Sequence, residues 1–395
     1  MKKIGFVVPW FRENIMGGAE MELTGLTKHM YEAGIDVEIL TTCVKDFQSD
    51  WNENYFKPGE DRVNGIPVRR FPVRKRCVSA FDDINEKLMQ GQRISIYEEK
   101  TYLRESVNSM ALYKYLEEHK DDYYAVIFIP YMFGTTFFGI KPVINKAIMI
   151  PCFHKESYAY FEYFRKRYSK VKGMIFHAQP ESDLAHLIYG LSEVNTAVLG
   201  EGLDTDISGD AERFRKKYNI DTPYFIYSGR KEVNKNVPLL LNHFAQYKKR
   251  NDNDLKLVMT GGGDIEIPES VKDAVVDLGF VDVQDKYDAM AGASFLCQPS
   301  VNESFSLVIM ESWLCGRPVL VNEACDVTID FARKTQGGLW FDTYVDFEGA
   351  VNYLLNNKDI ADKMGENGRK YVSSNFNWNT IVENYMNFIK ECIEE

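Results

Sequence analysis

The stretch QPSVNESFSLVIMESWLCGRPVLV, residues 298–321, decides the fold class of this chain. An apolar run ends at Pro299, a short polar loop follows, and helical periodicity begins near residues 304–306. Gly316 and Pro318 end this helix before a second β-branched run. A strand, a helix and a second strand in this order are typical of a βαβ unit, so we expect a parallel sheet covered by helices.

The same alternation runs through the rest of the chain in two series. Strands are expected at 4–9, 36–42, 125–130, 146–151 and 173–178, and then at 224–229, 256–261, 274–279, 294–300 and 318–323. A first helix is expected at 19–33, and two further helical stretches, at 361–372 and 378–391, close the chain. The predicted fold class is therefore α/β, with two doubly wound, Rossmann-like domains.

A Gly/Asp-rich segment, GEGLDTDISGD at residues 200–210, is suited to a hinge between the domains. We expect a first domain at 1–203, a second at 204–374 and a C-terminal helical segment at 375–395. Two such domains in tandem are expected to face each other across a cleft, because open sheets bind ligands at the carboxyl ends of their strands.

Composition narrows the classes of function. The 395 residues are 45% hydrophobic and 27% charged, which is typical of a folded globular protein. The net charge of −11 argues against nucleic-acid binding, which needs a basic face. Seven cysteines without CxxC spacing fit a reducing cytoplasm and predict no zinc site. Neither a signal peptide nor a transmembrane segment is expected, so the predicted localisation is cytoplasmic.

Two basic runs interrupt the otherwise balanced charge of the first 200 residues. They lie at 69–76, with five cations, and at 165–172, also with five. Solvated loops or helix faces are the favoured interpretation. The alternative is a patch that contacts anionic lipid headgroups or an anionic acceptor, which leaves association with the inner face of a membrane open.

Charged residues follow the expected strands of the second series. Glu303 stands just before the helix of the opening stretch and Glu311 lies inside it. Free backbone N–H groups at the start of that helix make an anion site. Arg230 follows the strand at 224–229, and Lys235 comes five residues later. Two cations at a strand edge can neutralise a departing diphosphate without a metal.

In this context the sequence resembles the retaining glycosyltransferases of family 4, whose pattern PSxxEgfGlvxlEAxaxGxPVv matches Pro299–Val319. The resemblance implies the GT-B architecture, in which the two Rossmann-like domains face a cleft and the C-terminal helix packs back on the first domain. It extends to the segment YFIYSGRKEVNKNVPLLL at 224–241 and to GGLWF at 337–341. It is strong in the second domain and faint in the first.

The resemblance also implies roles for single residues of the second domain. Glu303 would lie near the donor sugar, and Glu311 would hold the ribose hydroxyls. The phosphates would be held by Arg230 and Lys235 and by the backbone amides of Ser304, Phe305, Ser306 and Leu307. Phe280 and Val281 would lie beside the nucleobase. Serine stands at 304 and 306 where the family prefers glycine, which narrows the space near the phosphates.

In the first domain, Gly17 and Gly18 precede the first helix and match a Gly-Gly loop that faces the donor sugar and phosphate in the family. They do not form GxGxxG, so an NAD-binding function is weakly supported. His154 follows the strand at 146–151, where the family often has a histidine at the reaction centre. A structural role and a catalytic role for His154 both remain open.

No metal and no cofactor besides the donor substrate are expected. Two DxD-like triplets, Asp204/Asp206 and Asp252/Asp254, suggest a metal at first sight, but neither follows a strand. With Arg230 and Lys235 available, the diphosphate has cationic partners in the protein itself.

The sequence therefore predicts a retaining glycosyltransferase that moves a sugar from a UDP- or GDP-linked donor to an acceptor hydroxyl. The expected acceptor is a glycan or a lipid-linked molecule, in polysaccharide or glycolipid biosynthesis. The expected catalytic residues are His154, Arg230, Lys235 and Glu303. A non-catalytic sugar or nucleotide binder of the same fold and a sugar-nucleotide epimerase remain as alternatives.

Overall fold

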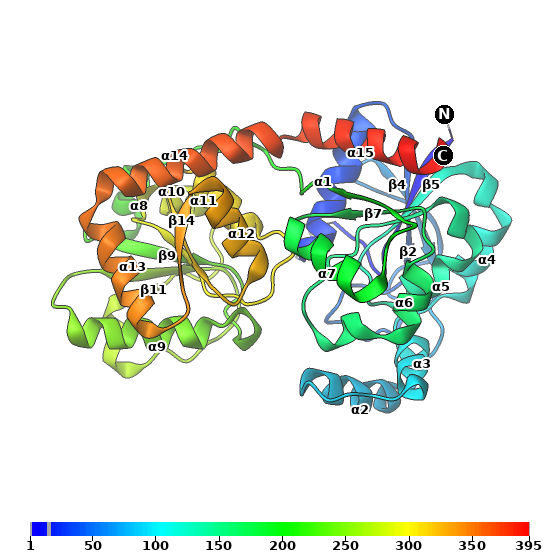
Figure 1. Ribbon diagram of the computed structural model, residues 1–395, viewed down its shortest axis with the longest axis horizontal. Coiled ribbons are helices and arrows are strands. Elements are labelled where there is room, and N and C mark those ends of the chain that lie inside the picture. Colours follow the sequence, from blue (N-terminus) through cyan, green and yellow to red (C-terminus); the bar gives the residue numbers. More distant parts are fainter. Residues whose placement is uncertain (1, 14–16, 395) are drawn as a thin grey trace. The chain divides into compact units, whose positions relative to one another are not determined.

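The computed structural model describes residues 2–13 and 17–394 and contains two compact units. Unit 1 comprises Met1–Leu203 together with Trp378–Glu395, and unit 2 comprises Asp204–Asn377. Each unit has its own sheet with helices packed around it (Figure 1).

The sheet of unit 1 has eight strands in the order β3-β4-β2-β1-β5-β6-β7-β8. Their bounds are β1 (Lys3–Val7), β2 (Val37–Thr42), β3 (Gly59–Val63), β4 (Ile66–Phe71), β5 (Tyr123–Phe128), β6 (Ala147–Met149), β7 (Gly173–Phe176) and β8 (Asn195–Val198). All neighbours are parallel except β3 and β4. The strand order reverses between β1 and β5, which makes this pair the topological switch point of unit 1.

The helices of unit 1 cover this sheet and include the last helix of the chain. They are α1 (Gly18–Glu32), α2 (Val78–Met89), α3 (Ile96–Glu105), α4 (Met110–Glu118), α5 (Gly134–Gly139), α6 (Glu162–Tyr168), α7 (Gln179–Tyr189) and α15 (Trp378–Glu394), with 3-10 turns η1 (Lys120–Asp122), η2 (Lys141–Lys146) and η3 (Ser157–Tyr160). On α1 the buried side chains include Leu23, Leu26 and Met30, spaced as expected for one helix face.

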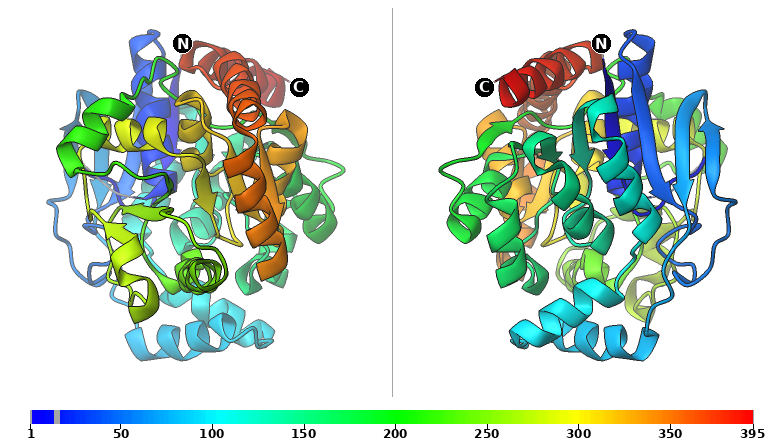
Figure 2. Two further views of the ribbon diagram at one scale, coloured as in Figure 1. Left: turned by 90° about the vertical axis from the view of Figure 1, so that its left-hand side faces the viewer. Right: turned by 90° about the vertical axis from the view of Figure 1, so that its right-hand side faces the viewer.

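The C-terminal helix α15 packs on unit 1, as the fold prediction expects. It contacts α1 and β5, and it runs beside α1 in the views of Figures 1 and 2. The indole of Trp378 lies against the backbone of Gly25 and Gly202, where a Cβ atom would collide with the ring. Tyr385 donates a hydrogen bond of 3.2 Å to the carbonyl of Gly200. Two glycines therefore make room for the helix that closes unit 1.

The sheet of unit 2 has six parallel strands in the order β11-β10-β9-β12-β13-β14. Their bounds are β9 (Tyr224–Ser228), β10 (Lys256–Thr260), β11 (Val275–Asp277), β12 (Leu296–Gln298), β13 (Val319–Asn322) and β14 (Gly338–Phe341). Counted within the unit, this is the Rossmann order 3-2-1-4-5-6. The switch point of unit 2 therefore lies between β9 and β12.

The helices of unit 2 cover both faces of its sheet. They are α8 (Ala211–Tyr218), α9 (Val237–Arg250), α10 (Val283–Gly292), α11 (Leu307–Leu314), α12 (Asp326–Thr335), α13 (Tyr344–Asn356) and α14 (Lys358–Asn375), with 3-10 turns η4 (Val233–Lys235) and η5 (Glu269–Ala274). In the described part of the chain, no helix combines the length and the apolar character that crossing a bilayer requires.

The α/β class with two doubly wound sheets is confirmed, but four short strands were not expected from the sequence. β3 has the sequence GEDRV and is exposed except at its last residue, so hydrophobic alternation cannot reveal it. Its antiparallel pairing with β4 makes it a strand. β4, β8 and β14 also lie near the edges of their sheets, where burial is incomplete and the sequence signal is weak.

Candidate functional site

The loops that follow β9 and β12 carry most of the sequence-predicted donor residues. Residues 229–235 leave the carboxyl end of β9, and residues 299–306 connect β12 to α11. Because β9 and β12 flank the switch point, their loops leave the sheet where doubly wound sheets bind ligands. This edge of the unit 2 sheet is the candidate site.

Lys235, Glu303 and Ser306 come together at this edge. The Nζ atom of Lys235 donates to Oε1 of Glu303 at 2.8 Å, and the two side chains are 26% and 11% exposed. Gln298 Nε2 lies 3.4 Å from the same carboxylate oxygen and 3.5 Å from the hydroxyl of Ser306. The ion pair thus joins the loop after β9 to the loop after β12.

Ser306 adopts a left-handed backbone conformation, with φ +72° and ψ +72°, directly before α11. This region is costly for a residue with a Cβ atom and costs glycine little. The conformation gives a physical reason for the glycine that the resembling family prefers here. Serine keeps the turn at the expense of some strain, and such strain is commonly found at functional sites.

Two asparagines fix the loop after β12. The Nδ2 atom of Asn236 donates to the carbonyl of Pro299 at 3.1 Å, and that of Asn322 donates to the same oxygen at 3.2 Å. The first comes from the loop after β9 and the second from the end of β13. The start of the Glu303 loop is therefore anchored to both neighbouring strands.

Arg230 lies in the same edge but outside the Lys235–Glu303 ion pair. Its side chain is 60% exposed, and its guanidinium is 3.3 Å from the carboxylate of Glu232. Its backbone is held more firmly, because Tyr227 donates a hydrogen bond of 2.6 Å to its carbonyl. Burial and then the charge of Glu303 raise the pKa of Tyr227, so this hydroxyl stays a donor.

Glu311 lies on α11, about 7 Å along the helix axis from Ser306. Its Oε1 atom is 2.6 Å from Nζ of Lys286 and 3.4 Å from the hydroxyl of Tyr287. Burial, followed by the charge of Glu311, raises the pKa of Tyr287. Glu311 therefore joins α11 to α10, and its predicted contact with ribose hydroxyls stays a prediction.

The loop after β10 adds features that the sequence analysis missed. Gly261 and Gly263 have positive φ angles of +112° and +96°. The exposed ring of Phe280 lies against Gly262, where a Cβ atom would collide with it. Phe280 and its neighbour Val281, the predicted base-side residues, thus follow β11 beside a glycine loop. Three glycines after an expected strand, in TGGGD at 260–264, were the available signal.

Lys231 is a second residue that the sequence analysis missed. It is buried, and its Nζ atom lies 2.6 and 2.7 Å from the two carboxylate oxygens of Asp277. This ion pair fastens the loop after β9 to the end of β11. No pattern in the sequence distinguishes Lys231 from its exposed neighbour Arg230, because only tertiary packing separates them.

Gly17, Gly18 and His154 belong to unit 1 and follow its strands β1 and β6. Gly17 is the N-cap of α1 with an extended backbone, and the space around Gly18 is open. Residues 14–16 of the same loop lie outside the described residues. His154 is partly exposed, with Nδ1 at 3.5 Å from the carboxylate of Glu156.

A buried charge cluster connects these segments of unit 1. His177 Nε2 is 2.7 Å from Oε1 of Glu22 on α1. The two carboxylate oxygens of Glu181 accept from the backbone N–H groups of Phe153 and His177, each at 2.7 Å. Burial lowers the pKa of His177, but the charge and hydrogen bond of Glu22 together with the charges of Glu181 and Glu201 outweigh it, and the pKa rises to about 10. The cluster holds the segment that carries His154.

Glu22, Cys152 and His177 also place three possible metal-ligating atoms within 4.8 Å of one another. A metal would have to displace the proton of His177. The raised pKa of that imidazole opposes the exchange, so we interpret the group as an ion-pair cluster. The predicted independence from metal stays a prediction.

A pocket of about 970 Å³ in unit 2 lies at the other end of the sheet. Its lining includes Pro223, Leu255 and Ser294, each of which precedes a strand. Doubly wound sheets bind their ligands outside the carboxyl ends of the strands. We therefore assign the candidate site to the edge with Lys235 and Glu303 and not to this pocket.

Unit 2 has recognisable relatives among known proteins. Residues 210–371 match the family Glycosyl transferases group 1. D-inositol 3-phosphate glycosyltransferase of Corynebacterium kroppenstedtii is 25% identical over 239 residues, which cover 56% of this chain and 51% of that protein. The chain spans about half the length of the curated relatives that it matches.

Two solved structures share the fold of the chain. Sucrose-phosphate synthase from Thermosynechococcus elongatus superposes with a TM-score of 0.70 at 15% identity, covering 100% of both chains. The Anabaena protein HepE, in complex with UDP and glucose, has a TM-score of 0.69 at 14% identity and covers 99% of this chain and 100% of its own. The chain therefore has the GT-B fold, and residues 210–371 in its second unit match the family Glycosyl transferases group 1.

Proposed function

We propose that this protein is a retaining glycosyltransferase that moves a sugar from a nucleotide-diphosphate sugar to an acceptor hydroxyl. The observation that carries the proposal is the Lys235–Glu303 ion pair beside the start of α11, at the switch point of unit 2. A Rossmann-like sheet binds nucleotides at such a point. The family match over residues 210–371 supports the same activity.

Lys235 and the first turn of α11 are proposed to hold the diphosphate. The leading N–H groups of a helix lack partners within the helix and favour an anion. The phosphate would compete with Glu303 for the ammonium of Lys235, and Arg230 has the exposed, loosely paired side chain needed to close on it. Cations in these positions stabilise the charge that develops on the leaving diphosphate.

Phe280 and Glu311 are proposed to hold the nucleoside. An exposed aromatic ring against a glycine backbone offers a face on which a base can stack. Glu311 has one carboxylate oxygen paired with Lys286, and its second oxygen would accept from ribose hydroxyls. The donor would be UDP- or GDP-linked; HepE, which shares the fold, is known in complex with UDP.

Unit 1 is proposed to serve the acceptor, a glycan or a lipid-linked molecule in polysaccharide or glycolipid biosynthesis. Gly17 and Gly18 would face the donor sugar and phosphate, and His154 would act at the reaction centre, with its loop held by Glu181. Contact of the basic segments of unit 1 with an anionic membrane surface is part of the same proposal.

The test is nucleotide binding by the full chain. Titration with UDP, GDP and ADP sugars is expected to raise the thermal unfolding temperature for one of them. Lys235→Ala is expected to weaken that binding by about tenfold or more, since a charge-assisted contact to phosphate is lost. Lys216→Ala, on the exposed face of α8, is the matched control and should bind normally.

Analysis of the products formed from the same nucleotide sugars separates the alternatives. A transferase releases nucleoside diphosphate, slowly with water and faster with an acceptor, and its product keeps the anomeric configuration of the donor. An epimerase changes the sugar without releasing it, and a binding protein does neither. If none of the nucleotide sugars binds, or if Lys235→Ala binds like the parent chain, the proposed function is wrong.

A further inference from the structure

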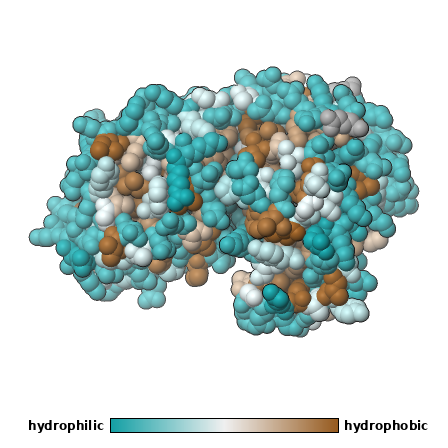
Figure 3. All heavy atoms as spheres, viewed as in Figure 1, coloured by the Kyte–Doolittle hydropathy of each residue, from teal (hydrophilic) through white to brown (hydrophobic). Residues whose placement is uncertain are grey.

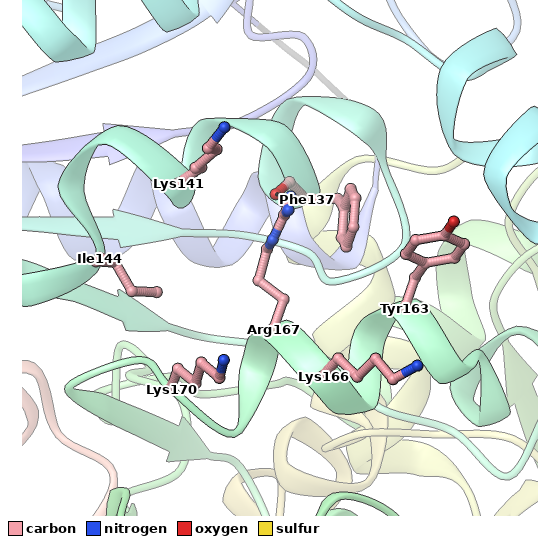
Figure 4. A pocket seen from close by; sticks show the side chains of 7 residues that line it. All are labelled: Phe137, Lys141, Ile144, Tyr163, Lys166, Arg167 and Lys170. Carbon is pink, nitrogen blue, oxygen red and sulfur yellow. Dashed lines mark hydrogen bonds between the residues drawn. The ribbon is translucent and has the colours of Figure 1, made fainter.

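Two adjoining pockets in unit 1 combine cations with apolar side chains. The first, of about 250 Å³, lies between α5 with η2 and α6 (Figure 4). The second, of about 470 Å³, extends toward α3 and the start of α4. They share Phe137, Tyr163 and Arg167. Each pocket has four cationic side chains, and among the described residues that line them there is no carboxylate.

The first basic run of the sequence is largely neutralised within the fold. Arg69 lies 3.0 Å from Glu38, Arg70 lies 2.8 Å from Asp61, and Arg74 lies 2.9 Å from Glu105 (the partners are buried or on the neighbouring strand). These arginines hold the edge of the sheet and the start of α2. Because their charges are already paired with carboxylates, they are poorly placed to bind an anionic ligand.

The second run is different, because its central cation, Arg167, makes no ion pair with an acidic side chain of the described residues. Arg167 is half-buried and donates a hydrogen bond of 2.6 Å to the backbone carbonyl of Phe137. Its guanidinium lies 3.8 Å from the centre of the Phe137 ring. Burial lowers the pKa of Arg167, because nearby charges do not offset the cost of removing its guanidinium from water. Figure 4 shows Arg167 reaching from α6 toward Phe137.

Two lysines add to the charge at Arg167. Lys141, at the start of η2, and Lys170, just after α6, line the first pocket and are exposed. Neither makes an ion pair with a carboxylate of the described residues. Lys166 is partly neutralised by Glu162 at 3.3 Å. A multiply charged anion would find three uncompensated cations here, and it would relieve the half-buried guanidinium.

The second pocket provides the apolar part of the site. Leu103, Met110 and Phe138 line it, and Met110 is 64% exposed. Large hydrophobic side chains are also exposed on the neighbouring helices α2 and α3, at Val78, Met89, Ile96 and Tyr97. Figure 3 shows hydrophobic residues on the part of unit 1 that contains α2 and α3. Exposed apolar groups beside a cationic pocket fit an amphiphile better than a water-soluble anion.

We propose that the two pockets bind an anionic membrane lipid, with its phosphate at Lys141, Arg167 and Lys170 and the first part of its chain in the apolar pocket. The inference rests on the membrane contact proposed above and turns it from a diffuse basic surface into a defined site. A nucleic acid is disfavoured because the chain has a net charge of −11 and the pockets are small.

The test measures sedimentation of the full chain with vesicles of phosphatidylcholine alone or with added phosphatidylglycerol. Binding is expected only to the anionic vesicles. The triple variant Lys141→Gln/Lys166→Gln/Lys170→Gln is expected to bind them about tenfold more weakly or worse, since each lysine near an anionic surface contributes to binding. All three side chains are exposed, so the fold should be unaffected.

A matched control carries the same change of charge elsewhere. Lys216→Gln/Lys249→Gln/Lys358→Gln replaces three exposed lysines of unit 2 and should bind anionic vesicles like the parent chain. Met110→Gln changes no charge and is expected to weaken binding to the same vesicles through loss of the apolar contact.

Several results would overturn the site. Equal loss in both triple variants would mean general charge attraction, and no binding by the parent chain would also remove the proposed membrane contact. Stabilisation by inorganic phosphate without vesicle binding would mean a soluble phosphate ligand. Nucleotide binding is measured in parallel and should be normal in the Lys141/Lys166/Lys170 variant, so failure of the transferase proposal is seen separately.

Discussion

At the scale of single residues, Ser306 shows how a departure from a family pattern can keep a backbone shape. Its left-handed conformation sets the start of α11, and Ser304 in the same loop has no positive φ angle. Only Ser306 therefore occupies a position where glycine has a conformational advantage.

Substituting each serine by glycine tests this difference. Ser306→Gly is expected to leave the free energy of unfolding unchanged or raise it by up to about 1 kcal/mol, because relief of strain offsets the added freedom of the unfolded chain. Ser304→Gly is the control and should lose about 0.5–1 kcal/mol. Chemical denaturation of both variants checks the prediction, and a larger loss in Ser306→Gly than in Ser304→Gly would contradict it.

His177 is a buried charge whose partners come from several elements of unit 1. Glu22 lies on α1, Glu181 on α7 and Glu201 after β8, and Cys152 lies after β6. The folded pKa of about 10 lies above the ordinary value of 6.5. The imidazolium therefore contributes its full stability below about pH 6.5, and that contribution is lost as the pH rises toward 10.

This linkage predicts a pH-dependent stability. The free energy of unfolding of unit 1 should fall by about 1 kcal/mol for each pH unit between 7 and 10. The double variant Glu22→Gln/His177→Gln should show a flatter profile in that range, whereas His177→Gln alone should be the least stable, because Glu22 then stays buried without its partner. Denaturant titrations at several pH values check this; parallel slopes in the parent and double variant would contradict it.

At the scale of elements, α15 shows how the end of the chain becomes part of the first unit. The helix offers Ile381, Tyr385 and Ile389 on one buried face. The ring of Trp378, its first residue, lies where side chains on Gly25 and Gly202 would collide with it. The same ring stacks on His29, with 4.4 Å between the ring centroids. The contact with α1 therefore depends on residues far apart in the sequence.

Gly25→Ala tests that dependence. The new methyl group would meet the indole of Trp378, so we expect a loss of about 1–3 kcal/mol and faster hydrogen exchange in α15. Gly349→Ala on α13 is the matched control, since nothing lies near its Cβ position, and it should gain up to about 1 kcal/mol. If both substitutions stabilise the protein equally, α15 does not rest on this glycine.

At the scale of the whole molecule, the two units divide the proposed work. Unit 2 contains the Lys235–Glu303 ion pair, the glycine loop at 261–263 and the match to the transferase family. Unit 1 contains the buried charge cluster and the cationic pockets. Ligands of different chemistry are therefore expected to stabilise different units.

Nucleotide binding should reveal this division. A saturating nucleoside diphosphate, at about 100 times its dissociation constant, is expected to stabilise the unit that binds it by about 2.7 kcal/mol. Hydrogen exchange should slow in the loops at 229–235 and 299–306 of unit 2, and the core strands of unit 1 should be little affected. Protection confined to unit 1 would contradict the assignment of the donor site.

How far the fold could be predicted depended on burial. The strands β9 and β10 are buried, except at Lys256, so hydrophobic runs identified them at 224–229 and 256–261. The charged edge strand β3 and the short strands β8 and β14 exist through pairing with neighbours, which no local pattern encodes. Local signals predict elements best where a single environment surrounds the whole segment.

For the candidate site too, the sequence predicted residues within local motifs but not the contacts between distant segments. Arg230, Lys235 and Glu303 were recognised from motifs beside strands, and the structure joins Lys235 to Glu303 but leaves Arg230 exposed. Lys231 and Lys286 were missed, because their partners Asp277 and Glu311 are 46 and 25 residues away. The roles of the predicted residues in binding and catalysis stay predictions until they are measured.

By itself, the sequence determined the α/β class, the two-domain organisation and the family resemblance, because these follow from the periodicity of apolar residues and from short motifs within single loops. Only the tertiary structure decided which charges are neutralised and which remain available. Arg70 and Arg167 look alike in their basic runs, yet Arg70 is paired with Asp61, whereas Arg167 faces a pocket that has no acidic side chain among its described lining residues. The physical reason is that an ion pair depends on distances in space, which chain folding sets and local sequence does not.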